Sequence, residues 1–277
     1  MASRIVLVTG STDGIGRATA AGIAAAGHEL ILHGRDADKG RRVVRELEEK
    51  TGSRPDLVIA DYAVQDDIRR MAAAIASRYT RLDVLINDAG TYQKTRQLTE
   101  EGVELTFAVN YLGPFLLTGL LLPLLERGSR IVTVASSAHF DVDRIDWKNL
   151  PHQRRYEPWG AYALSKFADV TFTYALARRM EGSGICANCL HPGVVDTKLS
   201  RAAAPGIATI NTKEGARTPL YLALSPAVEG ISGRYFEEEH PVHSSGLSHD
   251  RRVQERLWAL AEGLTGLSGI GRTGGAP

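Results

Sequence analysis

The chain has 277 residues, of which 43% are hydrophobic and 23% charged, a composition typical of a globular protein and not of a disordered one. Its 33 Lys and Arg side chains nearly balance 32 Asp and Glu side chains, so we expect no nucleic-acid partner and no membrane partner. Two cysteines cannot form a disulfide framework, which favours a reducing compartment, and we expect a cytoplasmic protein.

Short apolar runs alternate with longer helical patterns along most of the chain. We expect strands at 4–9, 29–33, 56–60, 82–87, 130–135, 184–190 and 233–236. We expect helices at 15–26, 38–51, 66–79, 100–110, 112–127, 161–180 and 213–223. The strand candidates show little polar alternation, as strands covered on both faces do. The alternation predicts an α/β fold, with one Rossmann-type, doubly wound parallel sheet of seven strands and helices on both faces.

One domain is expected, because no interdomain linker interrupts the pattern. It would cover residues 1–262, substrate loops included, and the Gly-rich residues 263–277 would form a flexible tail. The first apolar run is far too short for a signal peptide. The most apolar stretch, 111–125, holds Pro114 and Pro123 and falls short of the ~20 residues that span a bilayer. We therefore expect it to be a buried helix.

The first strand runs into the glycine-rich sequence Thr9-Gly10-Ser11-Thr12-Asp13-Gly14-Ile15-Gly16, and a helix follows. Glycines let backbone N–H groups approach a pyrophosphate, and the helix N-terminus adds its positive dipole end. The T-G-x-x-x-G-x-G spacing differs from the common G-x-G-x-x-G, and a plain turn is the alternative. The strand–turn–helix context favours a dinucleotide site. Its members would be Gly10, Ser11, Thr12, Gly14, Ile15 and Gly16.

The second strand ends at His33-Gly34-Arg35. An acidic side chain near this point would bind the ribose 2′-hydroxyl of NAD, but Gly34 offers none. Arg35 is suited to a 2′-phosphate, although a solvated surface arginine beside Asp36 is the alternative. NADP(H) is therefore expected in preference to NAD(H). Asp61, after the third strand, is either a contact to the adenine edge or an ordinary turn residue.

Tyr162 and Lys166 stand four residues apart in an expected helix and so share one face. A phenol ionises near pH 10, and a nearby cation favours the phenolate, so such a pair suits proton transfer. Alone, the pair would more often be an exposed helix feature. Ser136 and Ser137 follow the fifth strand, where open α/β sheets have their ligand crevice. Asn110 would hold a water molecule or tie down helical backbone.

In this order, the motifs resemble those of the short-chain dehydrogenase/reductase (SDR) family, over roughly residues 4–241. The residues that carry the resemblance are Thr9, Gly10, Gly14, Gly16, Asn87-Asp88-Ala89-Gly90, Asn110, Ser137, Tyr162, Lys166 and His191-Pro192-Gly193. The segments 109–118, 130–139 and 176–179 are most similar to the retinol-dehydrogenase-like branch.

The resemblance implies roles for these residues. Tyr162 would be the general acid/base, and Lys166 would hold the nicotinamide ribose and lower the tyrosine pKa. Ser137, in preference to Ser136, would orient the substrate carbonyl, and Asn110 would support a water relay to Lys166. Thr197 would contact the nicotinamide amide. The remaining expected cofactor contacts are Arg35, Asp61, Tyr62, Asn87, Ala89, Gly90, Tyr162, Lys166, Pro192, Gly193 and Val195.

Two features depart from the family's pattern. The usual second Asn of Asn-Asn-Ala-Gly is Asp88 here, which puts a carboxylate near the cofactor, harmless if it points away. We expect no membrane-anchoring N-terminus like that of many retinol dehydrogenases, so the resemblance does not imply a retinoid substrate. Aromatic residues in 140–159 and a small apolar stretch at 202–210, a candidate lid, favour a substrate with an apolar or aromatic body.

The expected function is an NADP(H)-dependent oxidoreductase that transfers hydride between nicotinamide and a carbonyl or alcohol carbon of a small molecule. The alternatives are a redox-neutral, epimerase-like enzyme and a non-catalytic NADP(H)-binding regulatory protein. The apolar helices 112–125 and 161–180 resemble the family's interfaces, so a homodimer or homotetramer is expected. No metal site is expected, because Cys186 and Cys189 would lie on opposite faces of a strand and no histidine shows zinc-site spacing.

Overall fold

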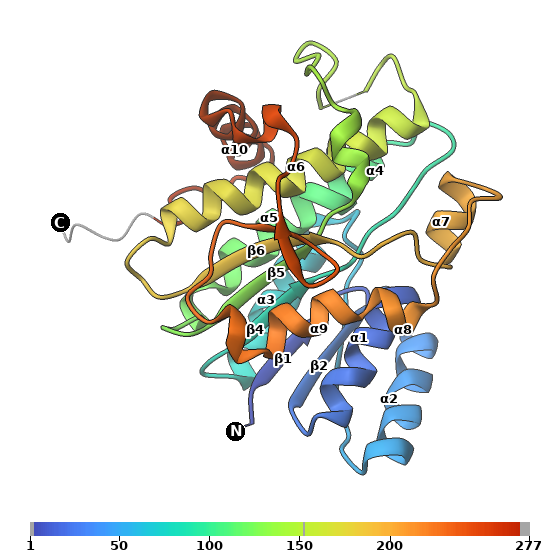
Figure 1. Cartoon of the computed structure of the whole chain (residues 1–277), viewed down its shortest axis with the longest axis vertical. Coiled ribbons are helices and arrows are strands. Elements are labelled where there is room, and N and C mark those ends of the chain that lie inside the picture. Colours follow the sequence, from blue (N-terminus) through green and yellow to red (C-terminus); the bar gives the residue numbers. More distant parts are fainter. Residues whose placement is uncertain (1–2, 152, 272–277) are drawn as a thin grey trace.

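Eight strands form one sheet in the computed structural model, which describes residues 3–151 and 153–271. Their order is β3-β2-β1-β4-β5-β6-β7-β8. Figure 1 labels its central part, from β2 to β6. The strands are β1 (Ile5–Val8), β2 (Glu29–Gly34), β3 (Asp56–Ile59), β4 (Val84–Asn87), β5 (Arg130–Val134), β6 (Cys186–His191), β7 (Tyr235–Glu237) and β8 (His240–Val242). The order reverses between β1 and β4, which is the topological switch point of a doubly wound sheet. The predicted Rossmann-type architecture is confirmed.

The sheet has one strand more than predicted. β1 to β7 pair in parallel, whereas β8 pairs antiparallel with β7. The turn between them places Glu238 and Glu239 at positive φ. β8 has only three residues, all exposed, and one is Pro241, so it carries no apolar pattern that a sequence prediction could detect.

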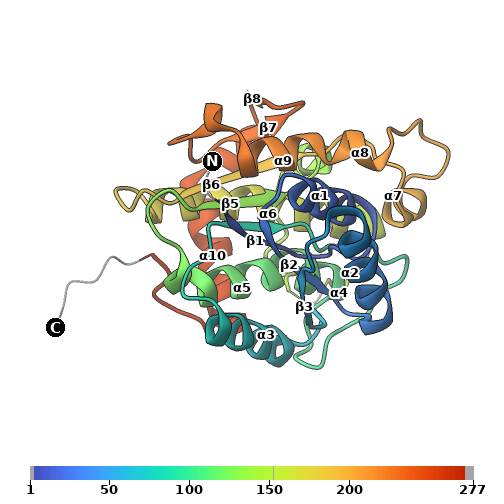
Figure 2. The ribbon, with the colours of Figure 1, turned by 90° about the horizontal axis from the view of Figure 1, so that it is seen from below.

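Helices cover both faces of the sheet (Figure 2). The α-helices are α1 (Gly14–Ala25), α2 (Ala37–Thr51), α3 (Gln65–Arg78), α4 (Leu105–Phe107), α5 (Gly113–Leu121), α6 (Pro158–Arg179), α7 (Lys198–Ala203), α8 (Thr212–Gly215), α9 (Arg217–Leu224) and α10 (Arg251–Thr265). One hydrophobic cluster joins the sheet to α3, α5, α6 and α10, and a second joins it to α1, α2 and α9. Neighbours along β1 alternate between them, since Leu7 belongs to the first and Val8 to the second.

The helix predicted at 100–110 begins only at Leu105, and at Ala108 its α-helical geometry gives way to a wider π-helical turn. Glu104 is fully buried and caps α4, because its carboxylate accepts hydrogen bonds from Thr106 N at 2.8 Å and Phe107 N at 2.9 Å. A π-helical turn, η1 (Ala108–Leu112), follows and leads into α5 and a short 3₁₀ turn, η2 (Leu122–Leu124). Such turns often mark functional sites. This one carries Asn110.

The stretch Leu105–Leu124 is long and apolar enough to cross a membrane, by length and composition alone. In the fold, 72% of its most apolar window is buried. Its side chains Phe115 and Leu116 are inaccessible to solvent and pack in the cluster shared with α3, α6 and α10. The apolar faces of α5 and α6 are therefore largely covered within one protomer. Their composition no longer argues for an oligomer interface, and the predicted oligomer stays a prediction.

The C-terminal part of the chain is more ordered than predicted. α10 runs to Thr265 and ends at Gly266, which has the left-handed conformation common after helices. Beyond it, Ile270 is only 6% exposed and packs in the core. The predicted loose tail beginning at Gly263 is thus wrong as far as Gly271, and the remaining residues, 272–277, lie outside the described residues. The high glycine content of this region concealed the apolar residues between the glycines.

Candidate active site

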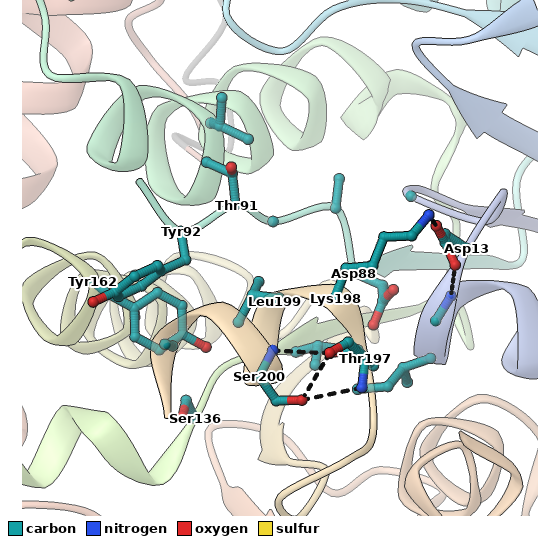
Figure 3. A pocket seen from close by; sticks show the side chains of 18 of the residues that line it. Asp13, Asp88, Thr91, Tyr92, Ser136, Tyr162, Thr197, Lys198, Leu199 and Ser200 are labelled. Carbon is teal, nitrogen blue, oxygen red and sulfur yellow. Dashed lines mark hydrogen bonds and ion pairs between the residues drawn. The ribbon is translucent and has the colours of Figure 1, made fainter. Parts of the chain in front are cut away.

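A cavity of about 850 Å³ opens at the carboxyl ends of the parallel strands, on both sides of the switch point between β1 and β4 (Figure 3). Most residues predicted for the site line this cavity. They are Gly10, Thr12, Gly14, Ile15, Arg35, Asp61, Tyr62, Ala89, Gly90, Ser137, Tyr162, Lys166, Pro192, Gly193, Val195 and Thr197. Four predicted residues do not line it, namely Ser11, Gly16, Asn87 and Asn110.

Three of these four, Ser11, Asn87 and Gly16, make contacts that hold the glycine turn and β4 in place. The Ser11 hydroxyl donates to the His33 carbonyl at 3.1 Å and accepts from the His33 N–H at 2.9 Å. The Asn87 side chain donates to Thr118 Oγ1 at 3.1 Å, away from the cavity. A Cβ at Gly16 would lie 2.6 Å from the Gly10 carbonyl oxygen, so this glycine lets α1 pack against the turn. These contacts support the turn and β4, and the predicted role of the three residues as cofactor contacts stays a prediction.

The glycine turn lies close to the end of β4. Gly10 has φ +67°, and a Cβ there would lie 2.8 Å from Ala89 Cα, so only glycine fits. Gly14 also has positive φ, and Asp13 caps α1 by accepting from Gly14 N at 3.0 Å. The turn thus leaves the N-terminal end of α1 facing the cavity. This is a cradle for a pyrophosphate.

Three basic side chains and one carboxylate form one edge of the cavity, which we call the cofactor edge and define as Arg35, Lys39, Lys198 and Asp13. All four line the cavity, and Asp13 accepts from Lys198 Nζ at 2.7 Å and from Lys39 Nζ at 3.5 Å. A Cβ at Gly34 would lie 2.5 Å from Thr12 Cγ2 and 2.9 Å from Thr12 Oγ1, so no acidic side chain fits there. The edge suits an anionic group such as a 2′-phosphate.

His33 and Tyr62 stack beside this edge, with ring centroids 4.7 Å apart. His33 Nδ1 accepts from the Gly10 N–H at 3.3 Å, which makes Nε2 the donor to the Ala60 carbonyl at 3.1 Å. These bonds assign a neutral ring, and burial lowers the pKa of His33 to about 4. Asp61 lines the cavity but also accepts from Ala63 N at 2.9 Å, as a turn residue does. The turn role of Asp61 is thus seen, and its contact to the adenine edge stays a prediction.

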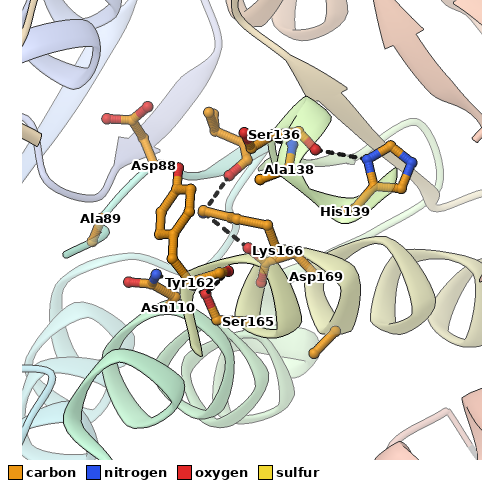
Figure 4. Close-up of polar contacts among 12 residues, drawn as sticks. Asp88, Ala89, Asn110, Ser136, Ala138, His139, Tyr162, Ser165, Lys166 and Asp169 are labelled. Carbon is orange, nitrogen blue, oxygen red and sulfur yellow. Dashed lines mark hydrogen bonds and ion pairs between the residues drawn. The ribbon is translucent and has the colours of Figure 1, made fainter. Parts of the chain in front are cut away.

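Tyr162 and Lys166 lie on the first turns of α6 and face the cavity together (Figure 4). They are only 8% and 5% exposed. Lys166 Nζ donates to the Val134 carbonyl at 2.9 Å and to Asp169 Oδ2 at 3.0 Å. Asp169 is 1% exposed and was not predicted, although its spacing of three from Lys166 puts it on the same helix face.

The environment of Tyr162 pulls its pKa in two directions. Burial raises the pKa, while the charge of Lys166 and a side-chain hydrogen bond with Ser136 lower it. Asp169 and Asp88 add to the rise, and the pKa lies above its ordinary value of 10. The lysine therefore acts in the predicted direction. Burial nevertheless outweighs the cation, so the net shift of the Tyr162 pKa is upward.

The serine that contacts Tyr162 is Ser136 and not Ser137, the one that the sequence analysis preferred. Ser136 hydrogen-bonds with Tyr162 through its side chain, and it also caps the 3₁₀ turn η3 (Ser137–Asp141) by accepting from Ala138 N at 3.2 Å. Ser137 is exposed, and its backbone N–H donates to His191 Nδ1 at 3.2 Å. The sequence shows two adjacent hydroxyls, and only the register at the end of β5 decides between them.

His139 anchors the segment that carries Ser136. Its Nδ1 bonds with the Ser136 carbonyl at 2.7 Å, and its Nε2 accepts from Ser245 N at 3.1 Å, so the proton lies on Nδ1. Burial lowers the pKa of this ring, which suits the neutral form. The segment that follows β8 thereby holds the backbone of Ser136 in place through His139.

Asn110 holds the neighbouring loop in place. Its Oδ1 accepts from Thr91 N at 2.7 Å, and its Nδ2 donates to the Thr91 carbonyl at 3.0 Å and to Ser165 Oγ at 2.9 Å. Ser165 in turn donates to the Tyr162 carbonyl at 2.7 Å. Asn110 thus ties the π-helical turn to the start of α6. The water relay to Lys166 stays a prediction.

Asp88, the departure from the family's pattern, points into the site. It lines the cavity (Figure 3). Its carboxylate accepts from the Gly16 N–H at the start of α1. Burial raises its pKa to about 7, although Lys166 and the hydrogen bond from Gly16 lower it. The condition under which the carboxylate would be harmless, a side chain turned away from the cofactor, is not met.

The opposite side of the cavity is apolar. Tyr92 and Trp159 each lie 5.8 Å from Tyr162, measured between ring centroids. Other apolar lining residues are Leu105, Val109, Leu199, Ala202, Ala203, Ala204 and Ile207, and Ile207 is 56% exposed. Of the aromatic residues that suggested a substrate pocket at 140–159, only Trp159 lines it. This side is lined by the unpredicted helix α7 and by residues after it, and the predicted lid at 202–210 begins within α7.

No group of three or more His, Cys, Asp or Glu side chains that could hold a metal occurs within residues 3–151 and 153–271. Both cysteines are free, and Cys189 is buried among Ala135, Val170, Tyr174 and Tyr235.

Comparison with known proteins gives consistent matches. A family model described as short chain dehydrogenase matches residues 4–207. Polyprenol dehydrogenase of Mus musculus is 38% identical over 96% of this chain and 85% of its own length. Retinol dehydrogenase 14 of Homo sapiens is 38% identical over 96% of this chain and 88% of its own length. A short chain dehydrogenase from Shigella flexneri, solved in complex with NADP, superposes with a TM-score of 0.71 at 28% identity, over 86% of this chain and 97% of that one.

Proposed function

The chain belongs to the short chain dehydrogenase family, in its retinol-dehydrogenase-like branch, and we propose that it transfers hydride between NADP(H) and a carbonyl or alcohol carbon of an apolar substrate. The enzyme class, an oxidoreductase that acts on CH–OH or C=O groups, follows from its relatives. One observation carries the finer proposal: the basic cofactor edge and the Ser136–Tyr162–Lys166 group line the same cavity as an apolar wall.

NADP(H) fits the residues that are present. The glycine turn offers a cradle that side chains would fill, and Arg35, Lys39 and Lys198 supply cations where a 2′-phosphate would lie. The relative solved with NADP supports this assignment. When bound, the cofactor supplies or accepts the hydride.

The protein's own residues handle the proton. Tyr162 would donate its hydroxyl proton to the substrate oxygen during reduction and remove it during oxidation. Ser136 would hydrogen-bond the same oxygen, because its side chain already meets Tyr162. Lys166 stands behind Tyr162 as the cation that favours the phenolate.

The substrate we propose is an extended apolar primary alcohol or its aldehyde. Tyr92, Trp159 and Ile207 line the open side of the cavity, and the last two are 37% and 56% exposed, so an apolar chain could lie along them and extend outward. The names of the relatives, polyprenol dehydrogenase and retinol dehydrogenase 14, describe alcohols of this kind. We propose a cytoplasmic location from the balanced charge, which cell fractionation would test.

NADPH consumption over a panel of apolar and polar aldehydes and ketones tests the function. Tyr162→Phe should lower kcat by a factor of ~10² to 10⁴, because the proton donor is lost, while NADPH binding is kept. Fluorescence titration with NADPH would check the binding. An active Tyr162→Phe enzyme, or turnover of the polar substrates alone, would refute the proposal.

The serine assignment has a matched control one residue away. Ser136→Ala should lower kcat by a factor of ~10², the usual loss for one donor to a reacting oxygen. Ser137→Ala should leave kcat nearly unchanged, because its contact uses the backbone N–H. The reverse pattern would restore the assignment that the sequence suggested.

A further inference from the structure

Lys166 and Asp169 form a buried ion pair beneath the proton donor. The two side chains are 6% and 1% exposed, and Nζ and Oδ2 lie 3.0 Å apart. The second carboxylate oxygen, Asp169 Oδ1, is buried without a hydrogen-bond partner among the described residues. A buried ion pair is rarely a net gain in stability, and an unsatisfied oxygen adds to its cost. Stability alone therefore does not account for this carboxylate.

The pair restricts what the ammonium group can do. A lysine ammonium has three donors, and here one is held by the Val134 carbonyl and one by Asp169 (Figure 4). The third is left for the cavity, which Lys166 lines, and a Cβ placed on Gly90 at the cavity wall would lie 3.8 Å from Nζ. Asp169 thus holds the ammonium in one orientation.

We propose that Asp169 is a positioning residue: its carboxylate orients Lys166, offsets part of the lysine charge, and so sets the pH range in which Tyr162 exchanges its proton. The proposal rests on the proposed function of Tyr162. It concerns a residue that does not line the cavity and touches the reacting atoms only through Lys166.

The charged groups around the pair support this role. Tyr162 and Asp88 act on Lys166 from the cavity side, and Tyr111 of η1 and Cys189 of β6 are electrostatically coupled to Asp169 from the elements packed against it. Burial would lower the pKa of Lys166, but Asp169, Tyr162 and Asp88 outweigh it, so the lysine stays charged.

The carboxylate and the cation act on Tyr162 in opposite senses. Lys166 lowers the pKa of Tyr162, whereas Asp169 raises it. Burial raises the pKa of Asp169 to about 6, against the charge of Lys166, so the pair is ionised at neutral pH. Removing the carboxylate's charge while keeping its shape should therefore favour the phenolate.

The experiment is the pH profile of alcohol oxidation by Asp169→Asn, which keeps the size of the side chain and an oxygen acceptor. The acidic limb of kcat should move to lower pH by about one unit, since a neighbouring charge typically shifts a pKa by that order. On the limb, kcat relative to its plateau should rise about tenfold. A uniform loss of kcat with the limb unmoved would mean a merely structural role and would overturn the proposal.

Asp88→Asn is the matched control, because it removes the other carboxylate that faces Lys166. It should move the limb less than Asp169→Asn, since Asp88 is the weaker influence on Tyr162. A limb that moves for Asp88→Asn alone would overturn the proposal. If Asp169→Asn does not fold, Asp169→Ser, also neutral and also an acceptor, takes its place with the same expectation.

A second readout separates this proposal from the proposed function. The ultraviolet absorbance of tyrosinate, taken as the difference between each protein and its Tyr162→Phe variant, reports the titration of Tyr162 without turnover. Asp169→Asn should lower the midpoint by about one unit. An unmoved midpoint would refute the role of Asp169, whereas a moved midpoint in a protein that turns over no substrate would refute only the proposed function.

Discussion

Two of the lysine–aspartate pairs at or behind the cavity wall have similar lengths but opposite surroundings. Lys198 and Asp13 lie 2.7 Å apart on the cofactor edge, with side chains 71% and 53% exposed, whereas Lys166 and Asp169 lie 3.0 Å apart and are almost fully buried. Water screens the first pair, so it contributes little to stability and can exchange its carboxylate for a phosphate. The second pair has no solvent to replace a lost partner. We therefore call the exposed Lys198–Asp13 pair the releasable pair and the buried Lys166–Asp169 pair the fixed pair.

The largest contrast between the pairs should appear in stability. Asp169→Ala leaves a buried ammonium without its counter-ion and should lower the free energy of unfolding by about 3–5 kcal/mol. Lys198→Ala, at the exposed pair, should leave the urea midpoint unchanged. Urea denaturation of both variants beside the parent protein measures this. Equal losses would show that burial does not distinguish the pairs.

An effect of about 2 kcal/mol is expected from His191, a buried neutral histidine that accepts a hydrogen bond from Ser137 N. Burial lowers the pKa of His191 to about 4, from 6.5 in the unfolded chain. Between these values the unfolded chain binds the extra proton, so stability is lost as the pH falls below 6.5. His191→Gln keeps an acceptor for Ser137 N, and acidification from pH 7 to pH 5 should cost this variant about 2 kcal/mol less than the parent. Identical pH dependences in denaturation would contradict the assignment.

The cofactor edge should govern cofactor choice instead of stability. Arg35→Ala should raise KM for NADPH by roughly 10- to 100-fold, the range for loss of a charged hydrogen bond, and leave KM for NADH nearly unchanged. Steady-state kinetics with both cofactors measure the ratio. An equal change in both KM values would remove Arg35 from the phosphate site.

The smallest effect is expected at the releasable pair itself. Lys198→Ala should raise KM for NADPH by roughly threefold at low salt and by less at high salt, because exposed charges are screened. Its kcat should stay the same. A change in kcat would instead show that α7 takes part in a later step, such as closure over the substrate.

Sequence reasoning found the parts of the site that are encoded locally. The turn from Gly10 to Gly16 and the Tyr162–Lys166 spacing are short patterns whose geometry follows from one helix or one turn. The same spacing argument could have predicted the ion pair with Asp169, because Asp169 stands three residues after Lys166 and so lies on the same helix face. The apolar residues of α10, such as Leu257 and Ala261, were likewise visible before the glycines that follow them.

Other parts depend on contacts between distant segments. Lys198 and Asp13 are in contact although 185 residues separate them in the sequence. His139 likewise contacts Ser245, which lies 106 residues later, after β8. The choice of Ser136 over Ser137 depends on where β5 ends and η3 begins, a shift of one residue that apolar periodicity does not resolve. Tertiary packing decides such points, and no local spacing reports them.

The contact between Gly34 and Thr12 constrains how the cofactor preference could evolve or be engineered. Both branches of the Thr12 side chain lie within 2.9 Å of a Cβ at position 34, so rotation of the threonine does not make room. Gly34→Asp introduced first creates a clash, whereas Thr12→Ala introduced first leaves space for it. A path from NADP to NAD therefore has a required order of mutational steps.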